Sequence, residues 1–138
     1  MKQHTHQIHI ATHGKGLYEF TREIHTWLHG QQAKTGLLTV FCQHTSASLV
    51  IQENADPAVL RDLEKWMARL APEAAHYEHD DEGPDDMPGH LRSAITRTSE
   101  TIPVMGGRLA FGTWQALYLW EHRQRGHRRR LVVSVIGE

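Results

Sequence analysis

The spacing of hydrophobic and polar positions predicts short strands interrupted by helices. Residues 4–12 alternate in character, which is typical of a strand, and apolar positions three and four apart predict a helix from Thr21 to about Gly30. Residues 37–43 are rich in Leu, Val and Phe, and residues 47–52 carry their apolar side chains on one face. Two further strands are therefore expected after the first helix.

The clearest helix signal follows these strands. Asp56 is a good N-cap, Pro57 suits the first helical position, and Pro72 stops the helix. Its apolar stripe, expected to face the core, consists of Leu60, Leu63, Met67 and Leu70. Another helix is expected to begin near Pro88, with Asp85 or Asp86 at its N-terminus. The residues predicted to face inward from that helix are Leu91, Ala94 and Ile95.

The last third of the chain returns to a strand pattern. Strands are expected at 101–105, at 108–121 with a break at Gly112, and at 131–136. The order of two strands, a helix, two strands, helices and three strands predicts an α+β fold, with an antiparallel or mixed sheet covered by helices. The sequence contains neither a GxGxxG fingerprint nor a phosphate-binding GK[ST] loop, which argues against a dinucleotide-binding fold.

Composition indicates a single soluble domain spanning residues 1–138. A chain of this length buries enough apolar surface to fold without disulfides, and Cys42 is its only cysteine, so the cytoplasm is the expected compartment. Cys42 lies in an apolar run and is interpreted as a buried, inert thiol. The net charge of -1 favours neither nucleic acid nor a membrane as partner, and no signal-like or membrane-spanning apolar segment is present.

The segment His76–His90, here called the acidic segment, is the strongest candidate for chemistry. It places six carboxylates and three imidazoles in fifteen residues, without Lys or Arg. Like charges at this density repel one another unless a cation compensates them, and imidazole with carboxylate suits zinc, manganese or magnesium. The alternative is a solvated acidic loop, because charge runs are usually hydrated.

Histidine is abundant elsewhere, with twelve in the whole chain. His4, His6 and His9 also suggest a metal site, but their positions in an alternating segment favour the wet face of a strand. The most economical metal site combines His44, from a strand end, with His79 and His90, and leaves a fourth position for water or a substrate oxygen. A serine hydrolase is disfavoured because the sequence has no GxSxG elbow.

A run of basic residues near the C-terminus has the opposite charge to the acidic segment. Residues 122–130 read HRQRGHRRR, with five arginines and two histidines around Gly126. The planar guanidinium binds phosphates and carboxylates with two hydrogen bonds, so this run could hold a phosphorylated ligand or pair with a neighbouring subunit. A solvated hairpin tip, turning at Gly126, explains the same residues equally well.

Several long motifs together carry a family resemblance. HTSASLVIQENADP, YEHDDEGPDDMPGH, GRLAFGTWQALYLWEHR and RRRLVVSVIGE occur in order over nearly the whole chain, and they resemble the YjbQ family, also described as secondary thiamine-phosphate synthases. The resemblance implies a trimeric α+β protein with sites between subunits. It also implies an enzyme that joins hydroxymethylpyrimidine diphosphate to thiazole phosphate and releases pyrophosphate.

On that resemblance, the motif residues receive expected roles. A divalent cation and cationic donors would hold the diphosphate, and an aromatic or amide surface would hold the pyrimidine. The residues expected to act in catalysis are Glu53, Asp86, Gln115, Glu121 and Arg123. Those expected to contact the substrate are Thr45, Ser46, Asn54, Asp85, Trp114 and His122.

Two alternatives to this enzyme remain open at the level of sequence. One is a noncatalytic trimer that binds a metal or a small ligand and whose synthase activity is incidental, and the other is a metal-dependent phosphohydrolase. Strand alternation places Trp114 and His122 on one face and Gln115 and Glu121 on the other. All four line one pocket only if the strand bulges or the pocket lies between subunits.

Overall fold

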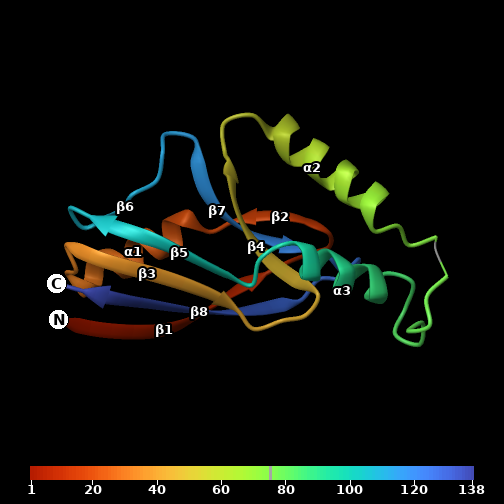
Figure 1. Ribbon diagram of the computed structural model, residues 1–138, viewed down its shortest axis with the longest axis horizontal. Coiled ribbons are helices and arrows are strands. Elements are labelled where there is room, and N and C mark those ends of the chain that lie inside the picture. Colours follow the sequence, from red (N-terminus) through yellow and green to blue (C-terminus); the bar gives the residue numbers. More distant parts are fainter. Residues whose placement is uncertain (75) are drawn as a thin grey trace.

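The structure is a computed structural model that describes residues 1–74 and 76–138. In this part of the chain, eight strands and three helices follow one another (Figure 1). They are β1 (Lys2–Ala11), β2 (Gly16–Glu19), α1 (Thr21–Gln31), β3 (Thr35–Cys42), β4 (Ala47–Glu53), α2 (Pro57–Leu70), α3 (Asp86–Ile95), β5 (Ser99–Met105), β6 (Arg108–Leu109), β7 (Gln115–Glu121) and β8 (Arg128–Gly137).

The strands form two sheets. The larger has the order β1-β8-β3-β5-β6, the smaller has the order β2-β7-β4, and the strand pairs are antiparallel. The inward residues of β3, β5 and β8 pack with Leu49, Leu117 and Leu119 of the smaller sheet and with Ile24 and Leu28 of α1. Buried and more exposed positions therefore alternate along β3 and β8 of the larger sheet, whose opposite face is covered by none of the helices in residues 1–74 and 76–138. Strand β7, in contrast, is buried at every position after Gln115.

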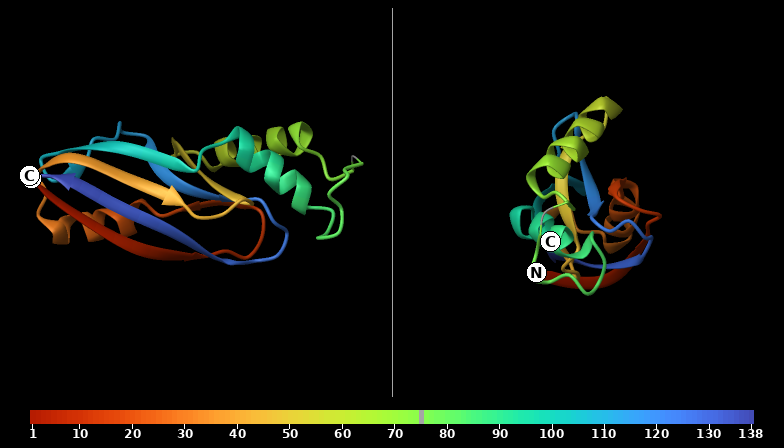
Figure 2. Two further views of the ribbon diagram at one scale, coloured as in Figure 1. Left: turned by 60° about the horizontal axis from the view of Figure 1, so that its bottom comes forward. Right: turned by 90° about the vertical axis from the view of Figure 1, so that its right-hand side faces the viewer.

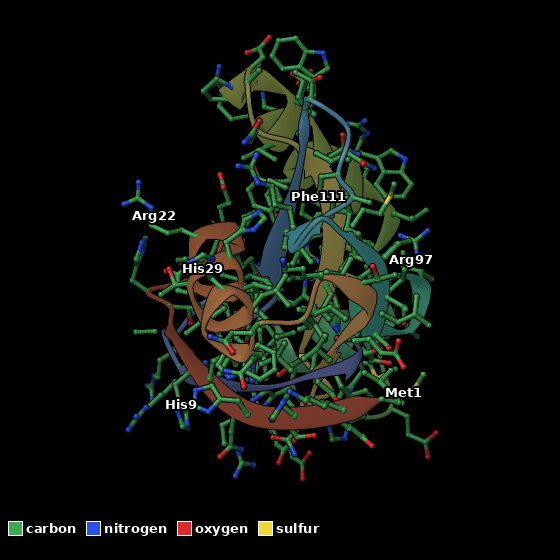
Figure 3. All side chains as sticks on the ribbon, turned by 90° about the vertical axis from the view of Figure 1, so that its left-hand side faces the viewer. Met1, His9, Arg22, His29, Arg97 and Phe111 are labelled. Atoms are coloured by element: carbon green, nitrogen blue, oxygen red, sulfur yellow. The ribbon has the colours of Figure 1, made fainter. Side chains whose placement is uncertain are left out.

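The helices divide between the two ends of the molecule. Helix α1 lies beside β1 over the inner face of the larger sheet, with Arg22 and His29 on its outer side (Figure 3). Helices α2 and α3 lie at the other end, away from the chain termini, and α2 projects from the body (Figures 1 and 2). The acidic segment begins in the connection between these two helices, at the tip of that end, and continues into the first turns of α3 (Figure 1).

The predicted α+β fold is confirmed. Asp56 caps α2, where its side chain accepts a hydrogen bond from the amide of Ala58 at 2.9 Å, and Pro57 is the first helical residue. Cys42 is buried, as expected, and burial raises the pKa of its thiol to about 11, so it remains protonated. The short strand β2 has too few residues for its alternation to be recognised, and its bounds were not predicted.

The predicted orientation of α3 is wrong. Ala94 and Ile95 face outward, with Ile95 54% exposed, and Leu91 is only half-buried. The buried side of α3 instead contains Gly89 and Arg92. This side of α3 faces the loop before β4 and the end of β7, since a Cβ at Gly89 would lie 3.4 Å from the Cβ of Ser46, and Arg92 is bound to Glu64 of α2 at 3.2 Å.

The outer end of α2 also departs from expectation. Met67 is fully buried, but Leu70 is 54% exposed although it belongs to the same apolar stripe. The side of the last turn that carries Met67 packs against the body of the protein, and Arg92 donates a hydrogen bond to the carbonyl of Ala71 directly after it, whereas Leu70 lies on the side of that turn that faces solvent. Within residues 1–74 and 76–138, none of the helices combines the length and apolarity needed to cross a membrane.

Candidate metal centre

The acidic segment and the start of α3 bring two imidazoles and a carboxylate together. Asp86 is the first residue of α3, so His90 lies one turn further on the same face, and His79 approaches from the preceding loop. One ligand atom from each of His79, Asp86 and His90 lies within 4.8 Å of the other two. This is the only such group of three found in the described part of the chain.

The distances show that the three side chains converge on a common point. His79 Nε2 lies 2.7 Å from Asp86 Oδ2, and His90 Nε2 lies 3.3 Å from the same oxygen. The two imidazole rings are 5.5 Å apart and meet edge to face at 69°. Glu82 adds a second carboxylate, with Oε2 3.3 Å from His79 Nε2. An ion entering this group would meet two nitrogens and at least one oxygen.

Electrostatics already favour a cation at Asp86. Burial opposes the charge of this carboxylate, but a hydrogen bond from His79 and the positive charge of Arg123 outweigh burial and lower the pKa of Asp86. The same hydrogen bond raises the pKa of His79 above its ordinary value of 6.5. The hydrogen bond between His79 and Asp86 therefore favours the protonated imidazole and the ionised carboxylate together.

His44 does not belong to this group. Its Nε2 accepts a hydrogen bond of 2.8 Å from the backbone amide of Arg130, which occupies the lone pair that a metal would need. The expected set of three histidines is therefore corrected to two histidines and Asp86. A spacing of four residues between Asp86 and His90, inside a predicted helix, was the signal that could have identified the carboxylate as a ligand.

The arginines of the basic run lie in two places. Arg123 and Arg125 lie in the loop between β7 and β8, and Arg128, Arg129 and Arg130 lie on the two faces of β8. Arg123 binds the carboxylates of Asp85 and Asp86 in its own chain, at 2.9 and 2.6 Å. Arg129 points inward and pairs with Glu121, whereas Arg128 and Arg130 are exposed on the outer face. Two arginines of the run, Arg123 and Arg129, therefore neutralise buried acids of the same chain, whereas Arg125, Arg128 and Arg130 are exposed.

Glu121 is a structural carboxylate in this arrangement. Its side chain is fully buried and accepts hydrogen bonds from Thr12, Arg129 and the amides of His122 and Arg123. Burial alone would raise its pKa, but the hydrogen bonds from Arg129 and Thr12 lower it. Glu121 is thus held ionised, away from solvent, which disagrees with its expected role as a catalytic acid or base.

The remaining predicted residues separate into two groups. Thr45 and Ser46 lie in the loop before β4, where Ser46 accepts hydrogen bonds from Arg129 and the amide of His122. The other group lies at the far end of the smaller sheet and consists of Glu53, Asn54, Trp114 and Gln115. The two ends of β7, Gln115 and Glu121, are roughly 20 Å apart at the rise of a strand. Within one chain, these groups do not form a common pocket.

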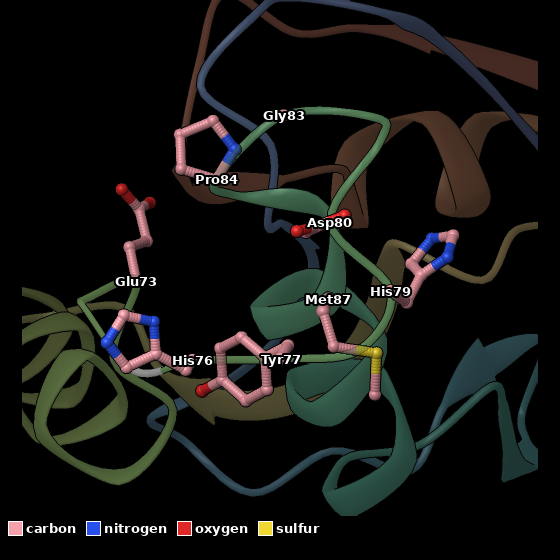
Figure 4. A pocket seen from close by; sticks show the side chains of 8 residues that line it. All are labelled: Glu73, His76, Tyr77, His79, Asp80, Gly83, Pro84 and Met87. Atoms are coloured by element: carbon pink, nitrogen blue, oxygen red, sulfur yellow. The ribbon is translucent and has the colours of Figure 1, made fainter.

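A cavity of about 290 Å³ lies beside His79 (Figure 4). Its walls include Tyr77, Pro84 and Met87, and His79 lies at its edge, opposite Glu73. The acidic segment supplies most of the lining of this cavity, so a small molecule there would lie next to His79. The expected contacts from Trp114 and Gln115 are absent from the lining.

Comparison with known proteins decides the family. The model of the family described as UPF0047 protein YjbQ-like matches residues 6–138. A UPF0047 protein of Synechocystis is 55% identical over 138 residues, which cover 99% of this chain and 94% of that protein. The chain belongs to the YjbQ family. YjbQ of Escherichia coli O157:H7 is 42% identical over 130 residues, with 94% of each chain covered.

Two solved structures share the fold. A YbjQ-like protein of unknown function from Sulfolobus solfataricus superposes with a TM-score of 0.88 at 20% identity, covering 99% of this chain and 100% of that one. A conserved hypothetical protein of Thermus thermophilus gives 0.82 at 32% identity, covering 94% and 98%. The first of these similarities supports the fold alone, because its sequence identity is low.

The expected thiamine-phosphate synthase function is not upheld by these relatives. Those described above carry family names without an activity, and the Sulfolobus protein is described as having unknown function. The structure adds a physical reason, since Arg123, expected to bind the leaving diphosphate, is bound to Asp85 and Asp86. Trp114 and Gln115, expected to orient the pyrimidine, lie at the other end of β7.

His122, expected to contact a substrate, is fully buried. Its Nε2 lies 2.8 Å from the hydroxyl of Ser48, which is itself hydrogen-bonded to Thr96. Burial, and then the neighbouring charges of Arg92 and Arg129, lower the pKa of His122 to about 3. This imidazole is neutral at physiological pH and supports the fold at the base of α3 instead of lining an open cavity.

Acid should destabilise the fold through His122. Its pKa in the folded state lies below the ordinary 6.5, so the stabilisation is present above pH 6.5 and is lost as the pH falls toward 3. Each proton taken up on unfolding contributes a slope of about 1.4 kcal/mol per pH unit. We expect the free energy of unfolding, measured with urea at several pH values between 6.5 and 4.5, to fall less steeply with decreasing pH for His122→Gln than for wild type. Equal slopes would contradict a buried neutral His122.

Proposed function

We propose that this YjbQ protein binds one divalent transition metal through His79, Asp86 and His90. The observation that supports this proposal most strongly is the convergence of their three ligand atoms within 4.8 Å. Buried charge adds to it, because Asp86 is 4% exposed and cations stabilise its ionised form. A metal would place a divalent charge where the contact between His79 and Asp86 now lies.

The ligand types favour zinc or manganese over magnesium. Magnesium prefers six oxygens and keeps several waters, whereas two imidazole nitrogens with one carboxylate oxygen suit zinc and other first-row metals. Distances of 2.7 and 3.3 Å between nitrogen and oxygen are close to those across a coordinated ion, so small movements of His79 and His90 are sufficient for binding.

We propose further that the metal is used in catalysis and is not only structural. Structural zinc sites are usually closed by four protein ligands, whereas catalytic sites have three and leave a position for water or a substrate oxygen. His79, Asp86 and His90 make three, and the cavity beside His79 offers space for a small molecule. The metal would polarise or activate the oxygen bound in the open position. With one reduced cysteine, the protein is proposed to act in the cytoplasm.

Metal titration tests the site directly. For protein purified without a histidine tag and stripped of metal, we expect calorimetry with zinc or manganese to show one ion per chain. His79→Ala and His90→Ala should each weaken binding by at least about 100-fold, because even changes to residues outside the ligand set cost 10-fold to 100-fold.

The matched control is His76→Ala. His76 is an exposed histidine of the same segment that lies outside the ligand group, so this variant should bind metal as the wild type does. Wild-type protein without a bound ion, or equal affinities for wild type and His79→Ala, would refute the proposed centre.

We also propose that the chain assembles as a homotrimer through the outer face of the larger sheet. No helix of the described chain covers this face, and it exposes apolar side chains that a monomer would leave in water. Leu37 and Phe41 of β3 are 48% and 47% exposed, and Ile136 of β8 lies on the same face. The resemblance noted from the sequence supports three as the number of chains.

Light scattering during size exclusion tests this assembly. The wild type should elute at three times the mass of the chain, and Phe41→Lys should dissociate it because a charge then replaces apolar contact. Trp66→Lys changes an exposed aromatic residue on α2 and serves as the comparison. A monomeric wild type would contradict the trimer, and dissociation only by Trp66→Lys would contradict the choice of the sheet face.

A further inference from the structure

Arg123 connects the loop after β7 to the acidic segment through three hydrogen bonds. Its Nε donates to Asp85 Oδ2 at 2.9 Å, its Nη1 donates to Asp86 Oδ1 at 2.6 Å, and its Nη2 donates to the carbonyl of Glu82 at 3.0 Å. A planar guanidinium presents these donors in a fixed fork, so the three acceptors are held in one relative arrangement. One side chain therefore determines the positions of two neighbouring acids and of the loop before them.

This arrangement assigns different tasks to the two oxygens of Asp86. Oδ1 is occupied by Arg123, and Oδ2 is the oxygen that lies 2.7 Å from His79 and 3.3 Å from His90. The carboxylate can rotate only by breaking the short bond to Nη1. Asp86 is thus oriented so that one oxygen faces the imidazoles, and it would bind a metal through that oxygen alone.

Arg123 is itself fixed by its surroundings. Its backbone amide donates to Glu121 Oε2 at 3.2 Å, and Glu121 is bound to Arg129 in the interior. The amide of Gln124 also donates to Asp85 Oδ2, at 2.8 Å. The loop after β7 is therefore a rigid support, and the position of Asp86 depends on contacts from the core of the protein.

We propose that Arg123 is a positioning residue of the metal centre, acting through Asp86 without touching the ion. Residues that hydrogen-bond to metal ligands commonly orient them, and mutation of such residues typically weakens metal binding by about 10-fold to 100-fold. The inference rests on the proposed metal function. It replaces the expectation that Arg123 binds a substrate phosphate, since its charge is already paired with Asp85 and Asp86.

Electrostatics alone would predict the opposite effect of removing Arg123. A guanidinium near a divalent cation repels it, so replacing Arg123 with a neutral residue should strengthen metal binding if only charge mattered. Positioning predicts weaker binding, because Asp86 Oδ2 is then no longer held toward His79 and His90. The sign of the change therefore separates the two explanations.

The experiment compares Arg123→Gln with Arg125→Gln. Arg125 is an exposed arginine of the same loop whose side chain makes no hydrogen bond to Asp85 or Asp86 in the described chain, so the second variant removes the same charge without the contact. Zinc affinity would be measured by calorimetry, and bound cobalt by its visible absorption spectrum, which reports the coordination geometry. We expect Arg123→Gln to weaken zinc binding by about 10-fold to 100-fold and to alter the cobalt spectrum. Arg125→Gln should match the wild type in both.

Arg123→Lys and Asp85→Asn extend the test if Arg123→Gln does not fold. Lysine keeps the charge but lacks the fork, so it should not restore wild-type affinity, and Asp85→Asn should weaken binding less than Arg123→Gln by removing one anchor. Wild-type affinity and an unchanged cobalt spectrum in folded Arg123 variants would overturn the inference while the metal site stands. Absence of metal from the wild type would instead refute the proposed function, and this inference with it.

Discussion

Crowding of carboxylates at the start of α3 is the constraint on which this end of the molecule depends. Asp85 and Asp86 are adjacent and buried, so each requires a positive charge or hydrogen-bond donors to remain ionised. Arg123 forms ion pairs with both carboxylates, and His79 forms a further hydrogen bond with Asp86. The loop from α2, the helix α3 and the end of β7 meet where they do because these charges must be paired.

The two sheets determine what this end can present. The larger sheet and α1 form the apolar core with the smaller sheet, and β7 carries that core to its end at Glu121. Immediately beyond it, the chain changes from apolar packing to buried ion pairs. The pair of Glu121 with Arg129 supports the base of the loop, and Arg123 extends the same network to the surface. A buried pair of this kind contributes a defined geometry more than it contributes stability.

Much of this structure was predictable from patterns in the sequence. The cap at Asp56, the apolar composition of β3, the strand-like pattern of β8 and the period of α1 are local features, and each predicted the correct element. The sequence also pointed to His79 and His90 as a pair because their neighbours are acidic, and the structure places their rings 5.5 Å apart. The orientation of α3 was not predictable, since its buried side is formed by Gly89 and Arg92, whose burial depends on Ser46 and Glu64 from distant parts of the chain.

The expected common pocket failed for a similar reason. Alternation along β7 describes which face a residue occupies, but Gln115 and Glu121 differ mainly in position along the strand. Buried polar partners such as Ser48, beside His122, carry no signal in the sequence because a serine in a strand usually has no special role. Charge, in contrast, can be recognised in the sequence. The acidic segment and Arg123 have opposite charges, and in the structure Arg123 pairs with Asp85 and Asp86.

Anomalous diffraction from crystals grown with zinc would test the central claim most directly. Data collected on either side of the zinc absorption edge should reveal one ion per chain bound by His79 Nε2, His90 Nε2 and Asp86 Oδ2, at about 2.0 to 2.2 Å from each. Asp86 Oδ1 should remain on Arg123. An absent peak, or one located only among other histidines with His79 and His90 turned away from Asp86, would contradict the account.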